Sequence, residues 1–194
     1  MVIGGGQVAQ RKAEALLQAE ARVIVIGPKL CPGINRMAKA GSIQAEARPY
    51  HAGDLEGAWL AIAATDDPGV NSSIAAEAED RGILVNVVDD PSRCSFIAPS
   101  IIRRGSLVVA ISTGGKSPAL ARKVRETLES ILPEEYDELT DLLAEARQEA
   151  KRQGKVIPPE QWQRSITPEV MGLLAEGSES KARDALMSNL GLKL

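Results

Sequence analysis

The stretch Gly4-Gly5-Gly6-Gln7-Val8-Ala9 decides the fold of this chain. Its first and third glycines and its alanine fit the spacing G-x-G-x-x-G/A, in which small residues allow a tight turn, a close backbone approach to a pyrophosphate and close packing of a helix on a strand. An apolar strand precedes the turn, and an alanine-rich helical pattern over residues 7–19 follows it. The free N–H groups at the start of that helix predict a dinucleotide-binding site made of backbone.

The choice between the two nicotinamide cofactors is left open by the next strand. A carboxylate about 20 residues beyond the glycines usually binds the hydroxyls of the adenosine ribose. Here the strand over residues 22–26 runs into Gly27-Pro28-Lys29, which contains neither an acid nor an arginine. We expect the backbone around Pro28 to contact the ribose, while Lys29 could tolerate a 2′-phosphate.

Helical patterns and apolar strands alternate along the first half of the chain. The helical patterns cover residues 7–19, 33–40 and 68–81, and the strands cover 22–26, 43–48, 58–64 and 83–88. This alternation predicts a Rossmann-like α/β domain whose parallel sheet has helices on both faces. We expect Trp59, inside the strand over 58–64, to pack in the core, and His51 to lie in a loop.

The character of the sequence changes after Asp90. Two short strands over residues 100–102 and 107–112 precede a helix over 118–131, and the rest is helical with proline breaks. We therefore predict a nucleotide-binding domain over residues 1–91, a small α+β segment over 92–132 and a helical C-terminal domain over 133–194.

The composition is that of a globular protein, with 44% hydrophobic and 25% charged residues among 194. No apolar run is long enough to cross a bilayer and no signal peptide precedes the glycines, so we expect a cytoplasmic protein without membrane contacts. Cys31 and Cys94 form no C-x-x-C pattern, which favours reduced thiols and argues against a metal site.

Positive charge is concentrated between Pro91 and Arg125. This segment has no acid and seven basic residues, namely Arg93, Arg103, Arg104, Lys116, Arg122, Lys123 and Arg125, although the chain as a whole has a net charge of −3. Such a patch attracts a polyanion. Because Phe96 is its only aromatic residue, the patch offers no stacking platform for nucleic acid, and a small molecule with several carboxylates fits better. A solvated helix face is the alternative for the last three basic residues.

Five motifs stand in an order that resembles a known family. They are Gly4-Gly5-Gly6-Gln7-Val8-Ala9, Ala63-Ala64-Thr65-Asp66-Asp67, Asn86-Val87-Val88-Asp89-Asp90-Pro91, Ser95-Phe96-Ile97-Ala98-Pro99-Ser100-Ile101-Ile102 and Ser112-Thr113-Gly114-Gly115-Lys116-Ser117-Pro118-Ala119-Leu120-Ala121-Arg122. Over residues 2–132 the chain resembles the precorrin-2 dehydrogenase/sirohydrochlorin ferrochelatase family, which also forms the first part of sirohaem synthase. No methyltransferase half is present, so the chain resembles the stand-alone version.

The resemblance implies NAD-dependent oxidation of precorrin-2, a tetrapyrrole with eight carboxylates, to sirohydrochlorin. It also implies a homodimer and, in some members, insertion of Fe²⁺. The family's key aspartate falls on Asp89, where a carboxylate could act as a general base, and Asp90 would then form the turn. A serine that is modified in some members is replaced here by Thr113, which puts that control in doubt.

The candidate site residues follow from the motifs together. The expected cofactor-binding residues are Gly4, Gly6, Gln7, Val8, Pro28, Lys29, Thr65, Asp66 and Asn86, and the expected substrate-binding residues are Arg93, Arg104, Lys116 and Arg122. Two alternatives stay open at this point. Asp67 can be a helix N-cap, and Asn86 can brace loops instead of binding the cofactor.

Three classes of function are compatible with these features. The first is the tetrapyrrole dehydrogenase, with or without iron insertion. The second is a regulatory Rossmann module that senses NAD without chemistry, which would not need the basic segment. The third is a dehydrogenase for another polyanionic substrate. Conversion of precorrin-2 with matched NADH formation would identify the first.

Overall fold

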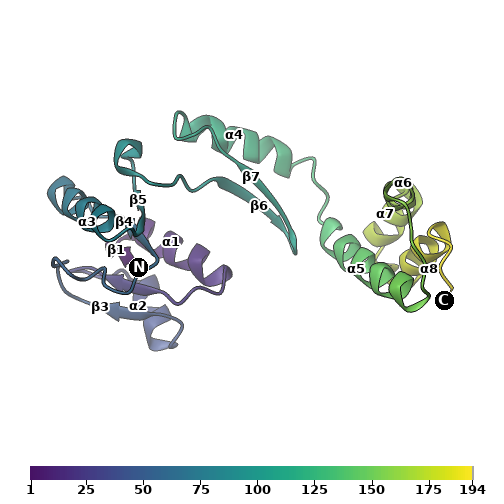
Figure 1. Cartoon of the computed structure of the whole chain (residues 1–194), viewed down its shortest axis with the longest axis horizontal. Coiled ribbons are helices and arrows are strands. Elements are labelled where there is room, and N and C mark those ends of the chain that lie inside the picture. Colours follow the sequence, from purple (N-terminus) through teal and green to yellow (C-terminus); the bar gives the residue numbers. More distant parts are fainter. Residues whose placement is uncertain (194) are drawn as a thin grey trace. The chain divides into compact units, whose positions relative to one another are not determined.

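The computed structural model describes residues 1–193, and the chain divides into two compact units, one over residues 1–98 and one from residue 99 onward (Figure 1). Within the described part of the chain, no helix is both long enough and apolar enough to cross a membrane. The division into three domains that the sequence suggests stays a prediction.

The first unit contains a five-stranded parallel sheet in the order β3-β2-β1-β4-β5. Its elements are β1 (Val2–Ile3), α1 (Gln7–Gln18), β2 (Ile24–Ile26), α2 (Pro32–Lys39), β3 (Gln44–Glu46), β4 (Leu60–Ala63), α3 (Pro68–Asp80), β5 (Leu84–Val87) and the 3₁₀ turn η1 (Pro91–Arg93). The order reverses direction at β1, as in doubly wound nucleotide-binding sheets. The predicted Rossmann-like fold is confirmed.

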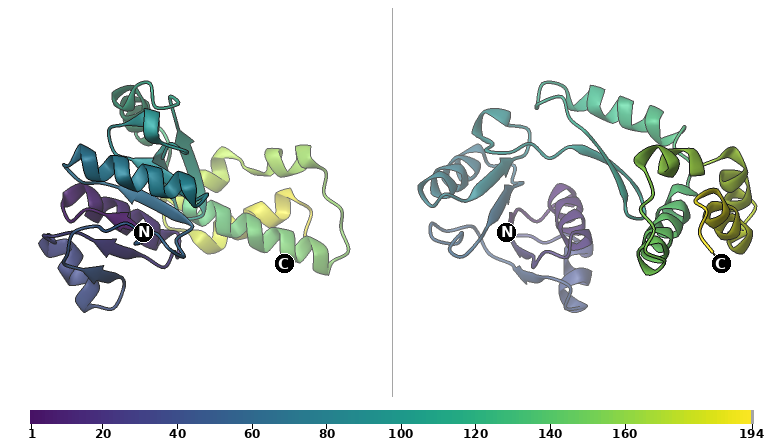
Figure 2. Two further views of the ribbon diagram at one scale, coloured as in Figure 1. Left: turned by 60° about the vertical axis from the view of Figure 1, so that its left-hand side comes forward. Right: turned by 45° about the vertical axis from the view of Figure 1, so that its right-hand side comes forward.

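Alternate residues of the strands build two apolar layers. Val2 and Val25 pack with residues of α1 and α2, whereas Ile3 and Ile26 pack with residues of α3 on the opposite face. The helices on the two faces can be followed in Figure 2. Because neighbouring strand residues point to opposite faces, both layers are needed to bury these nearly continuous apolar strands.

The second unit begins with the antiparallel pair β6 (Ser100–Arg104) and β7 (Leu107–Ile111), followed by α4 (Pro118–Glu129). Ile102 of β6 is 1% exposed and Ala121 of α4 is 7% exposed. A helical region follows, with α5 (Tyr136–Arg152), α6 (Pro159–Ser165), α7 (Pro168–Ala175) and α8 (Glu179–Asn189). These helices surround their own apolar cluster, which includes Leu139, Val170 and Leu186. The predicted order of small α+β segment and helical tail is confirmed.

The expectation for Trp59 was wrong, because its side chain is 92% exposed. Trp59 lies just before the first residue of β4, where its carbonyl accepts a hydrogen bond from the N–H of Leu84 at 3.3 Å. The predicted strand began at residue 58, two residues before the first residue of β4. The apolar run in the sequence therefore continues beyond the buried part of the sheet. His51 lies in a loop after β3, as predicted, and is exposed.

Candidate cofactor and catalytic site

The register of the sheet brings the carboxyl ends of its strands to one edge. Ile3, the last residue of β1, lies opposite Ile26 of β2 and Ala63 of β4. Ala63 in turn lies opposite Val87 of β5. The loops that follow these strands therefore meet at this edge, where open α/β sheets bind ligands.

The three glycines of the loop after β1 have different roles. Gly4 has a φ of +133°, and a Cβ atom there would lie 2.2 Å from the carbonyl oxygen of Ala64. A Cβ atom on Gly5 would lie 1.8 Å from the carbonyl oxygen of Lys29. A Cβ atom on Gly6, in contrast, would meet nothing within 4 Å. The first two glycines thus allow the loop to pack against the backbone of Ala64 and Lys29. The third glycine leaves the space before α1 open.

That open space has the properties of a pyrophosphate site. The N–H of Gly4 donates to Ile26 at 2.8 Å, and the carbonyl of Gly5 accepts from Cys31 at 2.8 Å, so the loop is held on both sides. Gln7 and Val8 begin the 12-residue helix α1, whose first N–H groups have no intrahelical partner. Donors at a helix start and the positive end of its dipole favour an anionic group. The residues present fit a dinucleotide.

The loop after β2 borders the same site. Pro28 and Lys29 are exposed, and the close approach of Lys29 to Gly5 places this turn beside the glycine loop. The acid that normally follows this strand is absent, as the sequence indicates. The ribose end of a bound dinucleotide would lie on this side of the edge.

The loop after β4 is stabilised by its own side chains. The Thr65 hydroxyl donates to the Asn71 side-chain oxygen at 2.8 Å. The Asp67 carboxylate accepts from the N–H groups of Gly69 and Val70, which makes Asp67 the N-cap of α3. The structure thus shows the helix N-cap that the sequence allows for Asp67. Asp66 is exposed beside it, and cofactor contacts of Thr65 and Asp66 stay predictions.

Asn86 lies inside the sheet and is 8% exposed. Its amide group donates to the carbonyl of Phe96 at 3.1 Å and to the sulfur of Cys94 at 3.5 Å. Asn86 therefore braces the segment that runs along the outer edge of β5, which was one of its two predicted roles. A contact between Asn86 and the cofactor stays a prediction.

The adjacent aspartates after β5 are in different environments. The Asp90 carboxylate accepts from the hydroxyl of Ser92 and pairs with Arg93, and these two groups hold the pKa of Asp90 below its usual value. Asp89 is exposed, has a φ of +61°, and makes no side-chain hydrogen bond within residues 1–193. A non-glycine residue in the left-handed region is uncommon, and aspartate is among the residues that adopt it most often. Of the two aspartates after β5, Asp89 is the one whose carboxylate is left available.

One residue near Asp89 could not be found from the sequence. Lys12 of α1 is half-buried, and burial lowers the pKa of its ammonium group, while the charges of Cys94 and Asp89 act in the opposite direction. The position of Lys12 on the helix gives no sequence signal, because lysines on exposed helix faces are common.

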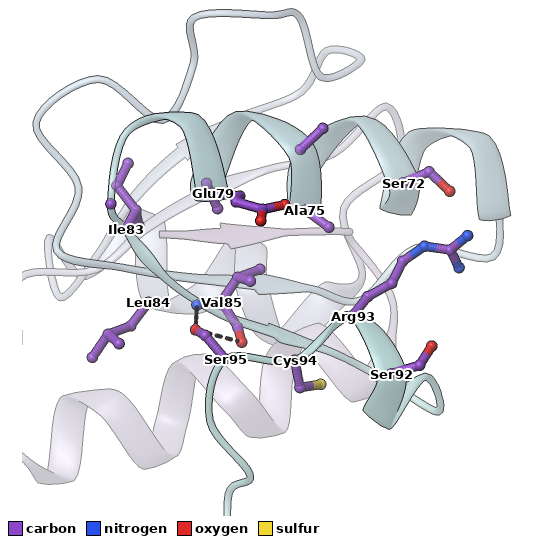
Figure 3. Close-up of a pocket in the computed structure, with 13 residues that line it drawn as sticks. Ser72, Ala75, Glu79, Ile83, Leu84, Val85, Ser92, Arg93, Cys94 and Ser95 are labelled. Atoms are coloured by element: carbon purple, nitrogen blue, oxygen red, sulfur yellow. Dashed lines mark hydrogen bonds between the residues drawn. The ribbon is translucent and has the colours of Figure 1, made fainter.

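A hollow on the surface borders α3 and the amino-terminal half of β5, and Figure 3 shows the side chains that line it. Ser95 closes one side of it, since its hydroxyl oxygen accepts from the N–H of Val85 at 2.7 Å. Arg93 also lines this hollow, whereas the glycine loop and Asp89 do not. It is separate from the predicted cofactor site.

Arg104 has a structural environment in the second unit. Its guanidinium donates to the carbonyl of Glu129, the last residue of α4, at 3.3 Å and to the carbonyl of Leu132 beyond the helix at 3.4 Å. Its Nε is buried and has no partner in the described part of the chain. Arg104 therefore links β6 to the end of α4. Its contact with the substrate stays a prediction.

The other predicted residues of the second unit lie in the loop before α4 and in the first half of that helix. Lys116 and Arg122 are exposed and form no ion pair with any of the described residues. Thr113 is half-buried, and its hydroxyl oxygen accepts from the N–H of Ser117 at 3.0 Å. The basic side chains are free to bind an anion, and modification of Thr113 stays a prediction.

Comparisons with known proteins agree with this geometry. Residues 1–100 match a family described as putative NAD(P)-binding, and residues 104–131 match the family of the sirohaem biosynthesis protein central region. The chain is 44% identical over 151 residues to a siroheme synthase of Pseudomonas entomophila, covering 78% of this chain and 33% of that protein. It is 39% identical over 188 residues to siroheme synthase 1 of Aeromonas hydrophila, covering 96% and 41%. The chain thus spans less than half the length of these relatives.

A solved structure is similar over nearly the whole chain. It is described as SirC, precorrin-2 dehydrogenase, with a TM-score of 0.74, 28% identity, and coverage of 97% of this chain and 92% of that one. The glycine loop, the β5 aspartates and the basic segment all lie within the matched regions. The chain binds a nicotinamide cofactor and belongs to the precorrin-2 dehydrogenase/sirohydrochlorin ferrochelatase family.

Proposed function

We propose that this protein oxidises precorrin-2 to sirohydrochlorin with NAD⁺ in sirohaem biosynthesis. The observation that carries the proposal is the single edge of the sheet at which the glycine loop and the free carboxylate of Asp89 both lie. β5 is two strands away from β1, or about 10 Å at the usual spacing. This separation suits a cofactor whose pyrophosphate lies at α1 and whose nicotinamide extends toward β5.

Asp89 is the proposed proton acceptor. The oxidation removes a hydride and a proton from the substrate, and bound NAD⁺ takes up the hydride. The exposed carboxylate of Asp89, which makes no competing side-chain hydrogen bond within residues 1–193, can take the proton. Asp90 cannot serve equally well, because Ser92 and Arg93 already occupy its oxygens.

The carboxylates of the substrate are bound by basic residues in this proposal. Lys116 and Arg122 are the strongest candidates, since both are exposed and form no ion pair with the described residues. Arg93 and Arg104 have partners within the chain and would have to share their donors. An arginine has five N–H donors, so such sharing is possible.

A homodimer is also part of the proposal. The sheet of β6 and β7 has only two strands, and isolated hairpins are marginally stable. Ile101 and Val108 on its outer face are 40% and 44% exposed. Pairing with a second copy would bury this face, and two-fold association is the commonest form of assembly.

Insertion of Fe²⁺ into sirohydrochlorin is a proposed second activity, with Fe²⁺ as a substrate. Insertion must remove protons from pyrrole nitrogens, and Asp89 is again the available carboxylate. Wild-type protein incubated with sirohydrochlorin and Fe²⁺ under anaerobic conditions should form sirohaem faster than a protein-free control. Equal rates would remove this activity from the proposal.

The main test is an anaerobic incubation of the protein with precorrin-2 and NAD⁺. We expect sirohydrochlorin and NADH to appear in equal amounts, followed by their absorbance. Binding of NAD⁺ without either product would favour a regulatory module that senses the cofactor. Turnover with a different polyanion but not with precorrin-2 would favour another dehydrogenase.

A further inference from the structure

A charged cluster lies at the carboxyl end of β3, next to the turn where the ribose carboxylate is missing. Glu46, the last residue of β3, lies opposite Ile26 of β2, and its carbonyl accepts from the N–H of Gly27 at 3.1 Å. Adjacent strands are separated by about 4.8 Å. A glutamate side chain can extend over a comparable distance, so Glu46 can reach the position that the acid after β2 would occupy.

The cluster is organised around Arg48. Its Nε donates to one oxygen of Glu46 at 2.7 Å. Its two terminal nitrogens bind the carboxylate of Asp54 in a bidentate pair at 2.7 and 2.9 Å, and one of them also donates to the carbonyl of Pro49. All three nitrogens of the guanidinium are thus engaged within the cluster.

The two carboxylates outnumber the single guanidinium, so the cluster has a net negative charge. Asp54 is fixed further by the N–H of His51 at 2.7 Å, and its side chain is 14% exposed. Glu46 is half-exposed, and its second oxygen makes no hydrogen bond with any described residue. That oxygen is available to an incoming hydroxyl group.

We propose that Glu46 supplies the ribose-binding carboxylate and that Glu46 and Asp54, by occupying Arg48, select NAD⁺ over NADP⁺. This inference rests on the proposed use of a nicotinamide cofactor at the glycine loop. The free oxygen of Glu46 accepts a hydrogen bond from a ribose hydroxyl. A 2′-phosphate would meet a net negative charge and an arginine that already uses four of its five N–H donors, whereas an arginine with free donors favours such a phosphate.

The test compares dissociation constants of NAD⁺ and NADP⁺ for the full chain, measured by calorimetry without substrate. The variants are Glu46→Gln, Asp54→Asn and the double variant, which frees Arg48 and removes both negative charges. We expect the double variant to bind NADP⁺ about tenfold more tightly and NAD⁺ more weakly than wild type. Glu56→Gln is the matched control, because Glu56 is exposed and lies with Met1 and Trp59 at the amino ends of the strands.

Circular dichroism establishes that each variant is folded before binding is measured. If Asp54→Asn is unfolded, Glu46→Gln alone must still weaken NAD⁺ binding relative to Glu56→Gln. A ratio of the two dissociation constants that is unchanged in every folded variant overturns the inference. Failure of the proposed oxidation would look different, since cofactor binding and its selectivity would persist while precorrin-2 is not consumed.

Discussion

The two units of this chain bury their apolar residues to different extents. In the first unit, a parallel sheet is covered on both faces, and its strand residues Val2, Val25 and Ala63 have no exposed surface. In the second unit, α4 covers one face of a two-stranded sheet, while Leu120 and Ile131 are 54% and 68% exposed. The sheet of the first unit is therefore covered on both faces, whereas the sheet of β6 and β7 leaves one face open, which the proposed homodimer would cover.

The largest expected effect comes from the glycine loop of the first unit. Gly4→Val should unfold this unit, because its backbone has a positive φ and a Cβ would collide with the carbonyl of Ala64. Gly6→Val should fold normally and fail to bind NAD⁺, since its side chain enters the open space meant for the pyrophosphate. Thermal unfolding and calorimetric titration with NAD⁺ measure the two effects.

Gly6→Val is the decisive variant of this pair, and Gly6→Ala is its graded control. Retained NAD⁺ affinity in a folded Gly6→Val protein would mean that the pyrophosphate binds elsewhere. Loss of fold in Gly6→Val would show that the space before α1 is smaller than the structure indicates.

The next effect concerns the exposed face of the second unit. Replacing Ile101 and Val108 by aspartate should abolish the homodimer, because charges would be placed on the apolar face that a second copy covers. Light scattering should then give the mass of one 20.6 kDa chain, whereas the wild type gives twice that mass. A wild type that is monomeric at micromolar concentration would contradict the proposed dimer.

A smaller effect separates two basic residues of the second unit. Lys116→Gln should raise KM for precorrin-2 about two- to fivefold without changing kcat, as expected for one lost exposed ion pair. Arg104→Gln should instead lower the free energy of unfolding by about 1–3 kcal/mol, since the carbonyls after α4 lose their donor. Steady-state kinetics and urea unfolding distinguish them. A normal KM for Lys116→Gln would make Lys116 a solvated surface residue.

The smallest effect is the pH dependence of the first unit through Glu77 of α3. Burial raises the pKa of Glu77, but hydrogen bonds from the Tyr50 hydroxyl and the N–H groups of Gly53 and Leu55 outweigh it and hold the pKa below the usual 4.5. The carboxylate therefore stabilises the fold above its usual pKa, and this contribution is lost as the pH falls below it. Urea unfolding should show a weaker acid dependence for Glu77→Gln than for wild type; identical pH profiles would contradict the assignment.

Local patterns predicted much of the first unit. The glycine spacing and the alternation of apolar strands with helices depend on residues close together in the sequence, so the sheet, its helices and the cofactor loop were predictable. The amino end of β4 was harder to predict, because Trp59 is as apolar as the buried residues that follow it. Burial depends on where the sheet stops, and hydrophobicity alone does not reveal that.

The remaining features depend on contacts that the sequence pattern does not contain. The left-handed backbone of Asp89 follows from how the segment after β5 returns to the sheet through Asp90 and Cys94. The link between Arg104 and the end of α4 joins residues more than 20 positions apart. The Glu46 cluster could be noticed only once the register placed β3 beside β2.

The central claim is that Asp89 and Asp90 have different tasks despite being neighbours. The most direct measurement is the rate of NADH formation from precorrin-2 and NAD⁺ by Asp89→Asn and Asp90→Asn, each first shown by calorimetry to bind NAD⁺. We predict that Asp89→Asn loses about 100-fold or more of kcat, the range expected when a general base is removed, while Asp90→Asn loses much less. An Asp89→Asn protein that binds NAD⁺ and oxidises precorrin-2 at nearly the wild-type rate would contradict the account.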